Sequence, residues 1–449
     1  MKGKAPDKQT QYNLVKKTLM EQLDFKRPLM LLAKHYPWDY VEKKFAQYYS
    51  DKGRPSKSIR LMVGLIILKQ LRNLSDAQLL EEWVENPYYQ YFCGEKEFQH
   101  KFPCDSSDIT YFRKRIGEEG FAELFKISVA MHGKKAKEDE IIIDSTVQEK
   151  NITYPTDIKL YSKVIERCKI IAKKENIKFR SLYKKELKKL NRIVRFKEIE
   201  KSNKSRQKQI ERAKFRIRTI ARIFVRELRR KLSISLDKYE NDFKNFEKIV
   251  YQKKNSHNKI YSLSEPETEC ISRGKPRKKY EFGHKVSLAI TKSTVIIIAI
   301  VLFIKNTFDG HTLSKTLEDV SKNTGKIPTV AYCDRGYRGV KEVNGTKIEI
   351  PDVPKKRTTP LEKKKARKNF GRRCSIEPVI GHLKHDFGMA RNRLKGNRGD
   401  AINMFSAAMA FNLAKWMRLR PLYLIYCFFK TFLLFTPKFE PCKVYVGGK

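Results

Sequence analysis

The chain has 449 residues, 40% of them apolar, which is enough for hydrophobic cores in two or three domains. Lys and Arg number 97 against 50 Asp and Glu, and the formal net charge is +47. Biased codon usage can enrich Lys but does not deplete Asp and Glu, so it does not explain this charge imbalance alone. The imbalance favours a polyanionic partner. DNA or RNA is favoured over an anionic membrane surface.

Residues 1–140 have a helical pattern and are predicted to form an N-terminal DNA-binding domain. Apolar residues recur at helical spacing over 59–71, and Ser75-Asp-Ala-Gln78 is a capping box that starts a second helix. A third helix is expected from Ser106, and it carries basic and aromatic residues over 110–116. Two helices joined by a short turn and followed by a basic helix resemble a helix-turn-helix module, although an ordinary helical bundle has the same pattern.

Strand character begins at Ile141-Ile-Ile143, and Asp144 is predicted to lie where this strand ends. A basic helical insertion is expected over 155–274. Within it, residues 161–250 contain 30 Lys and Arg, 11 Asp and Glu, and no Pro or Gly. This composition predicts two long helices, possibly a helical hairpin, that either contact the DNA backbone or form a solvated coiled coil.

Strands are expected again over 280–290, 295–304, 329–333 and 346–351, with a helix over 310–320 between the second and third of them. Another helix begins near Ser375, and a last one runs from 399 to 418. The resulting order is three strands, helix, strand, strand, helix. It predicts an α/β fold, an RNase H-like mixed sheet with flanking helices built from 141–154 and 275–420, and a tail over 421–449.

Three acidic residues are candidates for a metal centre. Asp144 and Asp334 each follow a short apolar run, and Glu377 opens an amphipathic helix in Arg373-Cys-Ser-Ile-Glu-Pro378. Phosphodiester chemistry uses divalent ions that activate the attacking oxygen and stabilise the leaving oxygen. Carboxylates suit Mg²⁺, and Mn²⁺ is possible. Lys384 lies two turns beyond Glu377 and is placed to hold a phosphate.

Asp309 is a rival for the second carboxylate. It precedes a predicted helix, where a role in capping or in the loop is favoured over a metal-binding role. His284 and His311 have no metal-ligand spacing and are expected to be structural.

Four motifs together resemble bacterial insertion-sequence transposases of the DDE type, in the broad group that includes insertion sequence five. The motifs are Ile143-Asp-Ser-Thr146, Phe308-Asp-Gly-His-Thr-Leu313, Tyr332-Cys-Asp-Arg-Gly-Tyr-Arg-Gly339 and Ile376-Glu-Pro-Val-Ile-Gly-His-Leu-Lys384. The match extends through Arg391-Asn-Arg-Leu-Lys-Gly396 and Gly399-Asp-Ala-Ile-Asn403. Related transposases carry a signature of Tyr, Arg, Glu and Lys at fixed spacing. Arg373, Glu377 and Lys384 keep that spacing in this chain, and Phe370 stands where the signature has Tyr.

The resemblance implies an RNase H-like catalytic domain with Asp144, Asp334 and Glu377 as the metal-binding triad. It implies that the protein binds double-stranded DNA at terminal inverted repeats and cleaves at the element ends. The freed 3′-hydroxyl then attacks target DNA without a covalent enzyme intermediate. It also implies a homodimer or higher oligomer that holds two ends together.

Several basic and aromatic residues near these motifs are expected to line the DNA path: Arg373, Lys384, Tyr337, Arg338, His382, Arg391 and Arg393. Two rival functions remain open. An RNase H-like nuclease or resolvase would hydrolyse strands without joining them. A non-enzymatic DNA-binding descendant of a transposase would have no need to keep all three acids.

The remaining features favour a cytoplasmic, nucleoid-associated protein without a membrane anchor. The eight cysteines form no C-x2-C pair, so we expect reduced thiols and no zinc site. The first residues are polar and unlike a signal peptide. The apolar runs at 295–304 and 422–435 are shorter than a membrane span, and the second is expected to be a packed or interfacial helix.

Overall fold

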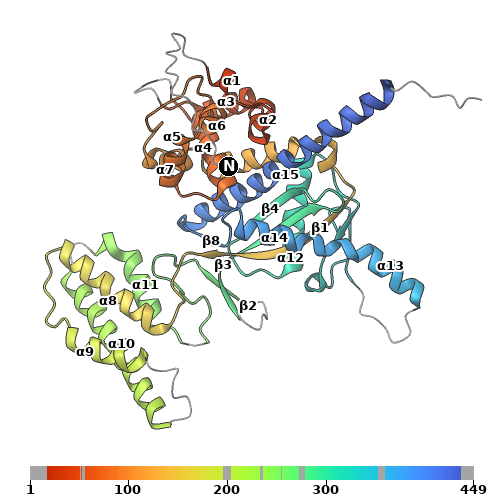
Figure 1. Cartoon of the computed structure of the whole chain (residues 1–449). Helices are drawn as coiled ribbons and strands as arrows, with labels where there is room; N and C mark the ends of the chain where they lie inside the picture. The colour runs from red at the N-terminus through yellow and green to blue at the C-terminus, as the bar shows by residue number, and fades with distance from the viewer. Residues whose placement is uncertain are drawn as a thin grey trace, which may run out of the picture.

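The computed structural model describes residues 18–50, 52, 56–195, 204–232, 236–253, 255–272, 279–351 and 359–435, with side chains left out at 363, 365–369, 372 and 420–435. The described residues form three hydrophobic cores. One lies among the N-terminal helices, one around a mixed sheet, and one inside a helical bundle that projects from the sheet (Figure 1).

The N-terminal part is helical, as predicted. Its helices are α1 (Leu19–Gln22), α2 (Pro28–His35), α3 (Trp38–Ala46), α4 (Ile59–Arg72), α5 (Asp76–Glu85), α6 (Pro87–Phe92) and α7 (Ser106–Ala130). Asn73 ends α4 in the left-handed conformation, with φ of 53°. Ser75 then begins α5 with the predicted capping box, which is confirmed. Asp105 caps α7.

The charge of α5 argues against its use as a DNA-recognition helix. It contains Asp76, Glu81, Glu82 and Glu85, and no Lys or Arg. A helix in the major groove lies beside phosphates, which would repel these carboxylates. The α4–α5 pair therefore has the predicted short connection, but the negative charge of α5 does not suit a helix that lies in the major groove.

The sheet has eight strands: β1 (Glu140–Lys150), β2 (Glu269–Ser272), β3 (Tyr280–Thr291), β4 (Ile297–Phe303), β5 (Val330–Tyr332), β6 (Glu342–Val343), β7 (Thr346–Glu349) and β8 (Arg391–Asn392). The main path runs β2-β3-β1-β5-β7-β6; β4 also pairs with β3, and β8 pairs with β1. β3 is antiparallel to β1 and to β4, whereas β5 is parallel to both β1 and β7. The predicted RNase H-like mixed sheet is confirmed.

Helices cover both faces of this sheet. Thr316 in α12 (Asp309–Thr324) donates to Ser287, whose partner in the ladder is Ser145. Gln148 points to the opposite face of β1, because side chains alternate along a strand. It donates to Asp400 in α15 (Gly396–Phe435). α12 and α15 therefore lie on opposite faces.

Two further helices precede α15: α13 (Pro360–Gly371) and α14 (Ile376–His385). α14 buries Ile376, Val379 and Leu383 in the core of the sheet. The last helix was expected to end at residue 418, but α15 continues to Phe435. The expected packing of the 422–435 side chains lies outside the described residues. Within the described ranges, no helix has the length and apolarity needed to cross a membrane.

α15 belongs to two cores. Ile402, Met409, Leu413 and Trp416 pack among the N-terminal helices, while side chains between them, including Met404 and Ala408, pack against the sheet. The N-terminal helices and the sheet are thereby joined through one continuous helix.

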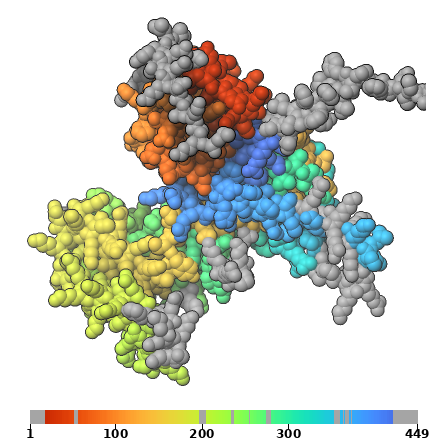
Figure 2. Space-filling model, in the orientation of Figure 1, coloured from red at the N-terminus to blue at the C-terminus, as the bar shows by residue number. Residues whose placement is uncertain are grey.

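The insertion leaves the sheet after β1 and returns before β2. It consists of α8 (Asp157–Lys174), α9 (Lys184–Arg195), α10 (Lys204–Lys231) and α11 (Glu240–Tyr251). The expectation of two long helices was wrong. Residues with positive φ, Asn176 and Tyr183, lie in the turn between α8 and α9, where a continuous helix is not possible. The bundle has its own core and forms a separate lobe (Figure 2).

Candidate active site

Asp144 lies on β1, and Asp334 lies just after the end of the adjacent parallel strand β5. The β1–β5 register pairs Ile142 with Tyr332; Asp144 lies two residues further along β1, and Asp334 lies two residues beyond the end of β5. Asp144 was predicted at the end of its strand, which is wrong. β1 continues to Lys150, because β3 pairs with it as far as Glu149 and β8 extends the pairing. Asp334 does follow the end of β5.

Asp334 is held by the turn that follows it. Its carboxylate accepts a hydrogen bond from the Gly336 backbone N–H at 2.8 Å. A Cβ at Gly336 would lie 2.9 Å from Asp334 Oδ1 and 3.2 Å from Asp309 Oδ2. The two carboxylates therefore border the same small space, which glycine keeps open.

Asp309 does not cap α12. The capping position is Phe308, and Asp309 is the first helical residue. Its Oδ1 accepts from Lys285 Nζ at 3.0 Å. The rival carboxylate identified from sequence is thus a close neighbour of Asp334 and is paired with a cation from β3.

Tyr337 lies beneath these carboxylates rather than in a DNA path. Its side chain is 1% exposed, and its hydroxyl has no hydrogen-bond partner among the described residues. Burial raises the pKa of Tyr337 well above its ordinary value, and the charges of Asp309, Asp144 and Asp334 raise it further. The predicted DNA contact is wrong for Tyr337, because the phenol is sealed inside the core beside the acidic group.

The Glu377 carboxylate is not grouped with those of Asp144 and Asp334. It lies in the first turn of α14 with its side chain 65% exposed, and its Oε1 is 3.8 Å from Arg373 Nη2. Arg373 also acts on Cys333, next to Asp334: burial raises the pKa of this thiol, Asp334 and Asp144 raise it further, and Arg373 opposes them. Among the described residues, no three His, Cys, Asp or Glu side chains form a group able to hold a metal ion.

The donor chemistry nevertheless fits a hard divalent cation. Asp144, on β1, and Asp334, just after the adjacent strand β5, are carboxylates of intermediate exposure. Glu377 is on the solvent side of a helix whose buried residues pack on the same core. Rotation of this exposed side chain away from Arg373 costs little, because the two charged groups are 3.8 Å apart and the Glu377 side chain is 65% exposed.

The other predicted DNA-contact residues are only partly gathered in one place. Lys384, Arg391 and Arg393 line one cleft between α14, β8 and the N-terminal helices. Arg338 is exposed beyond the Asp334 turn. His382 is half-exposed, and its Nδ1 pairs with Asp386 Oδ2 at 2.6 Å. Only the first three are thus brought together.

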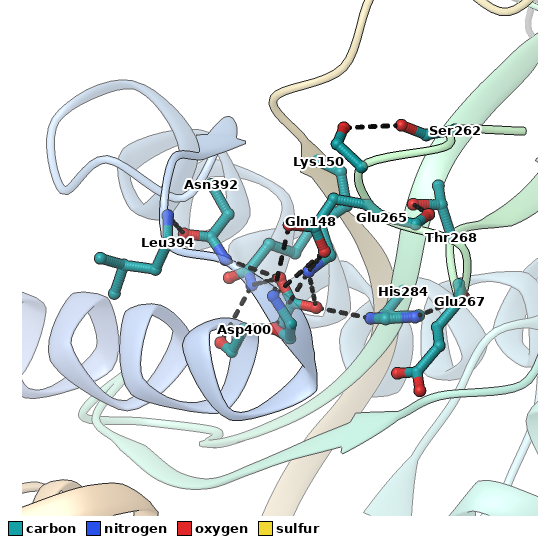
Figure 3. A network of polar contacts seen from close by, with 12 residues as sticks. Gln148, Lys150, Ser262, Glu265, Glu267, Thr268, His284, Asn392, Leu394 and Asp400 are labelled. Atoms are coloured by element: carbon teal, nitrogen blue, oxygen red, sulfur yellow. Dashed lines mark hydrogen bonds and ion pairs between the residues drawn. The ribbon is translucent and has the colours of Figure 1, made fainter. Parts of the chain in front are cut away.

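A buried ionic network beyond Asp144 on β1 was not predicted from the sequence (Figure 3). Lys150 Nζ, 2% exposed, contacts Asp400 Oδ2 at 2.7 Å, Glu265 Oε2 at 3.0 Å and the Gly396 carbonyl. Asn392 donates to Asp400 as well. Alternation along β1 places Lys150 on the same face as Asp144, but this pattern does not reveal the acidic partners of Lys150, which come from distant parts of the chain.

His284 completes the network and is structural, as predicted. Its Nδ1 lies 2.7 Å from Asp400 Oδ2, and its Nε2 lies 3.0 Å from the Glu267 carbonyl. Both partners are acceptors, so the ring satisfies them only when both nitrogens are protonated. Burial lowers the pKa of His284, but the hydrogen bonds to Asp400 and Glu267 outweigh burial and raise it overall.

Comparison with known proteins agrees with this architecture. Residues 17–115 match the family "Transposase domain (DUF772)", and residues 247–413 match "Transposase DDE domain". The second range contains Asp309, Asp334 and Glu377. The uncharacterized protein ORF8 in the nfe locus of Rhizobium meliloti is 43% identical over 163 residues, which are 35% of this chain and 79% of that protein. No solved structure matches the chain.

The two matches cover the N-terminal helices and most of the sheet, and both families are transposase families. DDE transposases as a class are DNA-binding nucleases and transferases that use divalent metal ions, which agrees with carboxylates at matching positions of β1 and after β5. The chain belongs to the DDE transposases of insertion sequences.

Proposed function

We propose that this transposase binds the terminal inverted repeats of its own element, cleaves at the element ends and joins the freed 3′-hydroxyl to target DNA. The main support is the placement of Asp144 on β1 and of Asp334 just after the adjacent strand β5, with Glu377 on the helix that packs against the same core. The proposal includes membership of the group that contains insertion sequence five, and action on DNA in the cytoplasm.

Asp144, Asp334 and Glu377 are the residues that would hold Mg²⁺, or Mn²⁺. Bound divalent ions supply activation of the attacking oxygen and stabilisation of the leaving oxygen. Arg373, which lies 3.8 Å from the Glu377 carboxylate, would offset part of the repulsion between this carboxylate and the aspartates when the three gather around the metal ions. Arg338, His382, Lys384, Arg391 and Arg393 bind DNA phosphates and fix the scissile bond in position.

A strand-transfer assay tests this reaction. Labelled terminal-repeat DNA is incubated with the protein, Mg²⁺ and an unlabelled target duplex. We expect labelled ends joined to the target. Cleavage without joining would identify a nuclease or resolvase, and binding without cleavage would identify a non-enzymatic descendant.

Because two ends must be held together, the complex with DNA is expected to contain at least two copies of the chain. Light scattering measures the mass of this complex.

The N-terminal region, 1–140, is proposed to contact DNA through the first turns of α7 rather than through α5. Tyr111 is 61% exposed there, and the Lys114 ammonium lies 5.8 Å from the centre of its ring. An exposed aromatic ring beside a cation is typical of surfaces that bind nucleic acid.

The insertion is proposed to bind the DNA backbone through α9. This helix exposes Lys184, Lys185, Lys188, Lys189, Arg192 and Arg195. Its single acidic residue, Glu186, is paired with Arg216 of α10.

Replacing Lys185, Lys188, Lys189 and Arg192 by Gln is expected to reduce the slope of log K against log salt by up to about 3.6, since each phosphate contact contributes about 0.9. None of these residues is buried, so the fold should persist. Filter binding from low to high salt measures the slope. The control is four Gln substitutions at Lys26, Lys34, Lys43 and Lys44, which are exposed and lie outside α7. An unchanged slope would make the insertion a structural or protein-binding element.

A further inference from the structure

A cleft of about 770 Å³ separates the α4–α5 turn from the segment that follows α14. One wall comes from the N-terminal helices and the other from the catalytic part of the chain. The walls are fixed to each other by hydrogen bonds: Gln70 donates to the Phe387 carbonyl, and Asn73 donates to the His385 carbonyl at 3.2 Å. The cleft therefore has a defined width.

The lining of this cleft is strongly cationic. Of the described residues that line it, five are Lys or Arg and one is acidic: Lys69, Arg113, Lys384, Arg391, Arg393 and Asp76. Asp76 is already engaged, because it accepts from Lys69 at 2.8 Å and from both terminal nitrogens of Arg113. One carboxylate between two cations leaves an excess of positive charge even before Lys384, Arg391 and Arg393 are counted.

The ionisation of the wall residues agrees with this excess. Burial lowers the pKa of Lys69, Asp76 opposes this effect, and the charges of Arg113 and Arg393 lower the pKa further. Burial alone would raise the pKa of Asp76, but Arg113 and Lys69 outweigh it and lower the pKa to about 2. Arg393 thus acts on Lys69 across the cleft, and the two walls share one positive field.

The cleft also lies at a fixed distance from the candidate active site. Lys384 is in the same helix as Glu377, seven residues on, which corresponds to about 10 Å along the axis. A DNA strand that passes the active site thus reaches the cleft within a few nucleotides.

We propose that this cleft is a phosphate clamp, in which Lys69 from the N-terminal helices and Arg391 and Arg393 from the catalytic part hold the DNA backbone next to the scissile end. Asp76 and Arg113 act as positioning residues for Lys69. This inference rests on the proposed function, because it assigns part of the DNA path of the same transposase.

The test compares Lys69→Met with Lys44→Met on terminal-repeat DNA. Lys44 is exposed on α3 and does not line the cleft, so the two variants lose the same charge at different places. We expect Lys69→Met to weaken binding about tenfold and to reduce the salt slope by about 0.9, while Lys44→Met matches the wild type. Arg393→Gln changes an exposed side chain and should reproduce the slope effect even if Lys69→Met impairs folding.

Phosphate ethylation interference supplies an independent readout. Ethylation of the clamped phosphate removes its charge, so it should weaken binding of the wild type and have a smaller effect on Lys69→Met and Arg393→Gln, each of which has already lost one of the three cations. Suppose that both variants match Lys44→Met in DNA affinity, salt slope and ethylation interference while the wild type joins ends. The clamp proposal is then wrong, and the proposed transposase function is unaffected. If the wild type neither cleaves nor joins end DNA, the proposed function itself fails.

Discussion

Replacing Asp144 or Asp334 by Asn, or Glu377 by Gln, should lower the rate of end cleavage at least about 10³-fold, which corresponds to about 4 kcal/mol of activation free energy. Each change removes one negative charge from the residues proposed to hold the metal ions and keeps the side-chain size. The affinity for terminal-repeat DNA should persist, because the proposed phosphate contacts come from other residues. Single-turnover cleavage with Mg²⁺ and filter binding of the same preparations measure the two quantities.

Asp139→Asn and Glu118→Gln are matched controls. Asp139 is exposed just before β1 and pairs with Lys326, and Glu118 is exposed on α7. Both should cleave at the wild-type rate. A triad variant that cleaves as fast as its control is not a metal ligand. The Glu377→Gln result is the most informative test of the metal-binding triad, because in this structure the Glu377 carboxylate pairs with Arg373.

Replacing Lys150 by Met should destabilise the protein by about 3–5 kcal/mol, since it leaves Asp400 and Glu265 with an uncompensated buried charge. The midpoint of thermal unfolding should fall by about 10 °C, at about 2–4 °C for each kcal/mol in a domain of this size. Calorimetry or circular dichroism measures the shift.

Lys347→Met is the control for this change, because Lys347 is 69% exposed and pairs with Glu349 at the surface. Its unfolding midpoint should stay within about 1–2 °C of the wild type. Combining Lys150→Met with Asp400→Asn should cost less than the sum of the two single changes, because the pair shares one interaction. A Lys150→Met midpoint equal to that of Lys347→Met would mean that the network does not stabilise the fold.

Sequence alone could predict the sheet and the proximity of Asp144 and Asp334, because apolar runs before both residues indicated strands of one core. It could not place Asp144 within its strand. Ser145 and Thr146 are polar but buried, so they suggested a strand end where the ladder with β3 in fact continues. Register, rather than hydrophobic pattern, decides where such a strand stops.

Three other features depended on tertiary contacts that no local pattern reveals. Tyr337 lies in a basic, glycine-rich turn typical of a DNA contact, yet the turn folds its ring into the core. Lys150 is buried because Glu265, which precedes β2, and Asp400 of α15 lie around its ammonium group (Figure 3). The break between α8 and α9 occurs without Pro or Gly, at Asn176 and Tyr183.

The sharing of α15 between two cores has a mechanical consequence. A rod whose side chains alternate between the N-terminal helices and the sheet cannot tilt relative to one without disturbing the other. We therefore expect these two parts to melt in a single cooperative step and to approach DNA as one rigid block. Any rearrangement that carries Glu377 toward the aspartates then falls on the segment between α13 and α15, which contains α14.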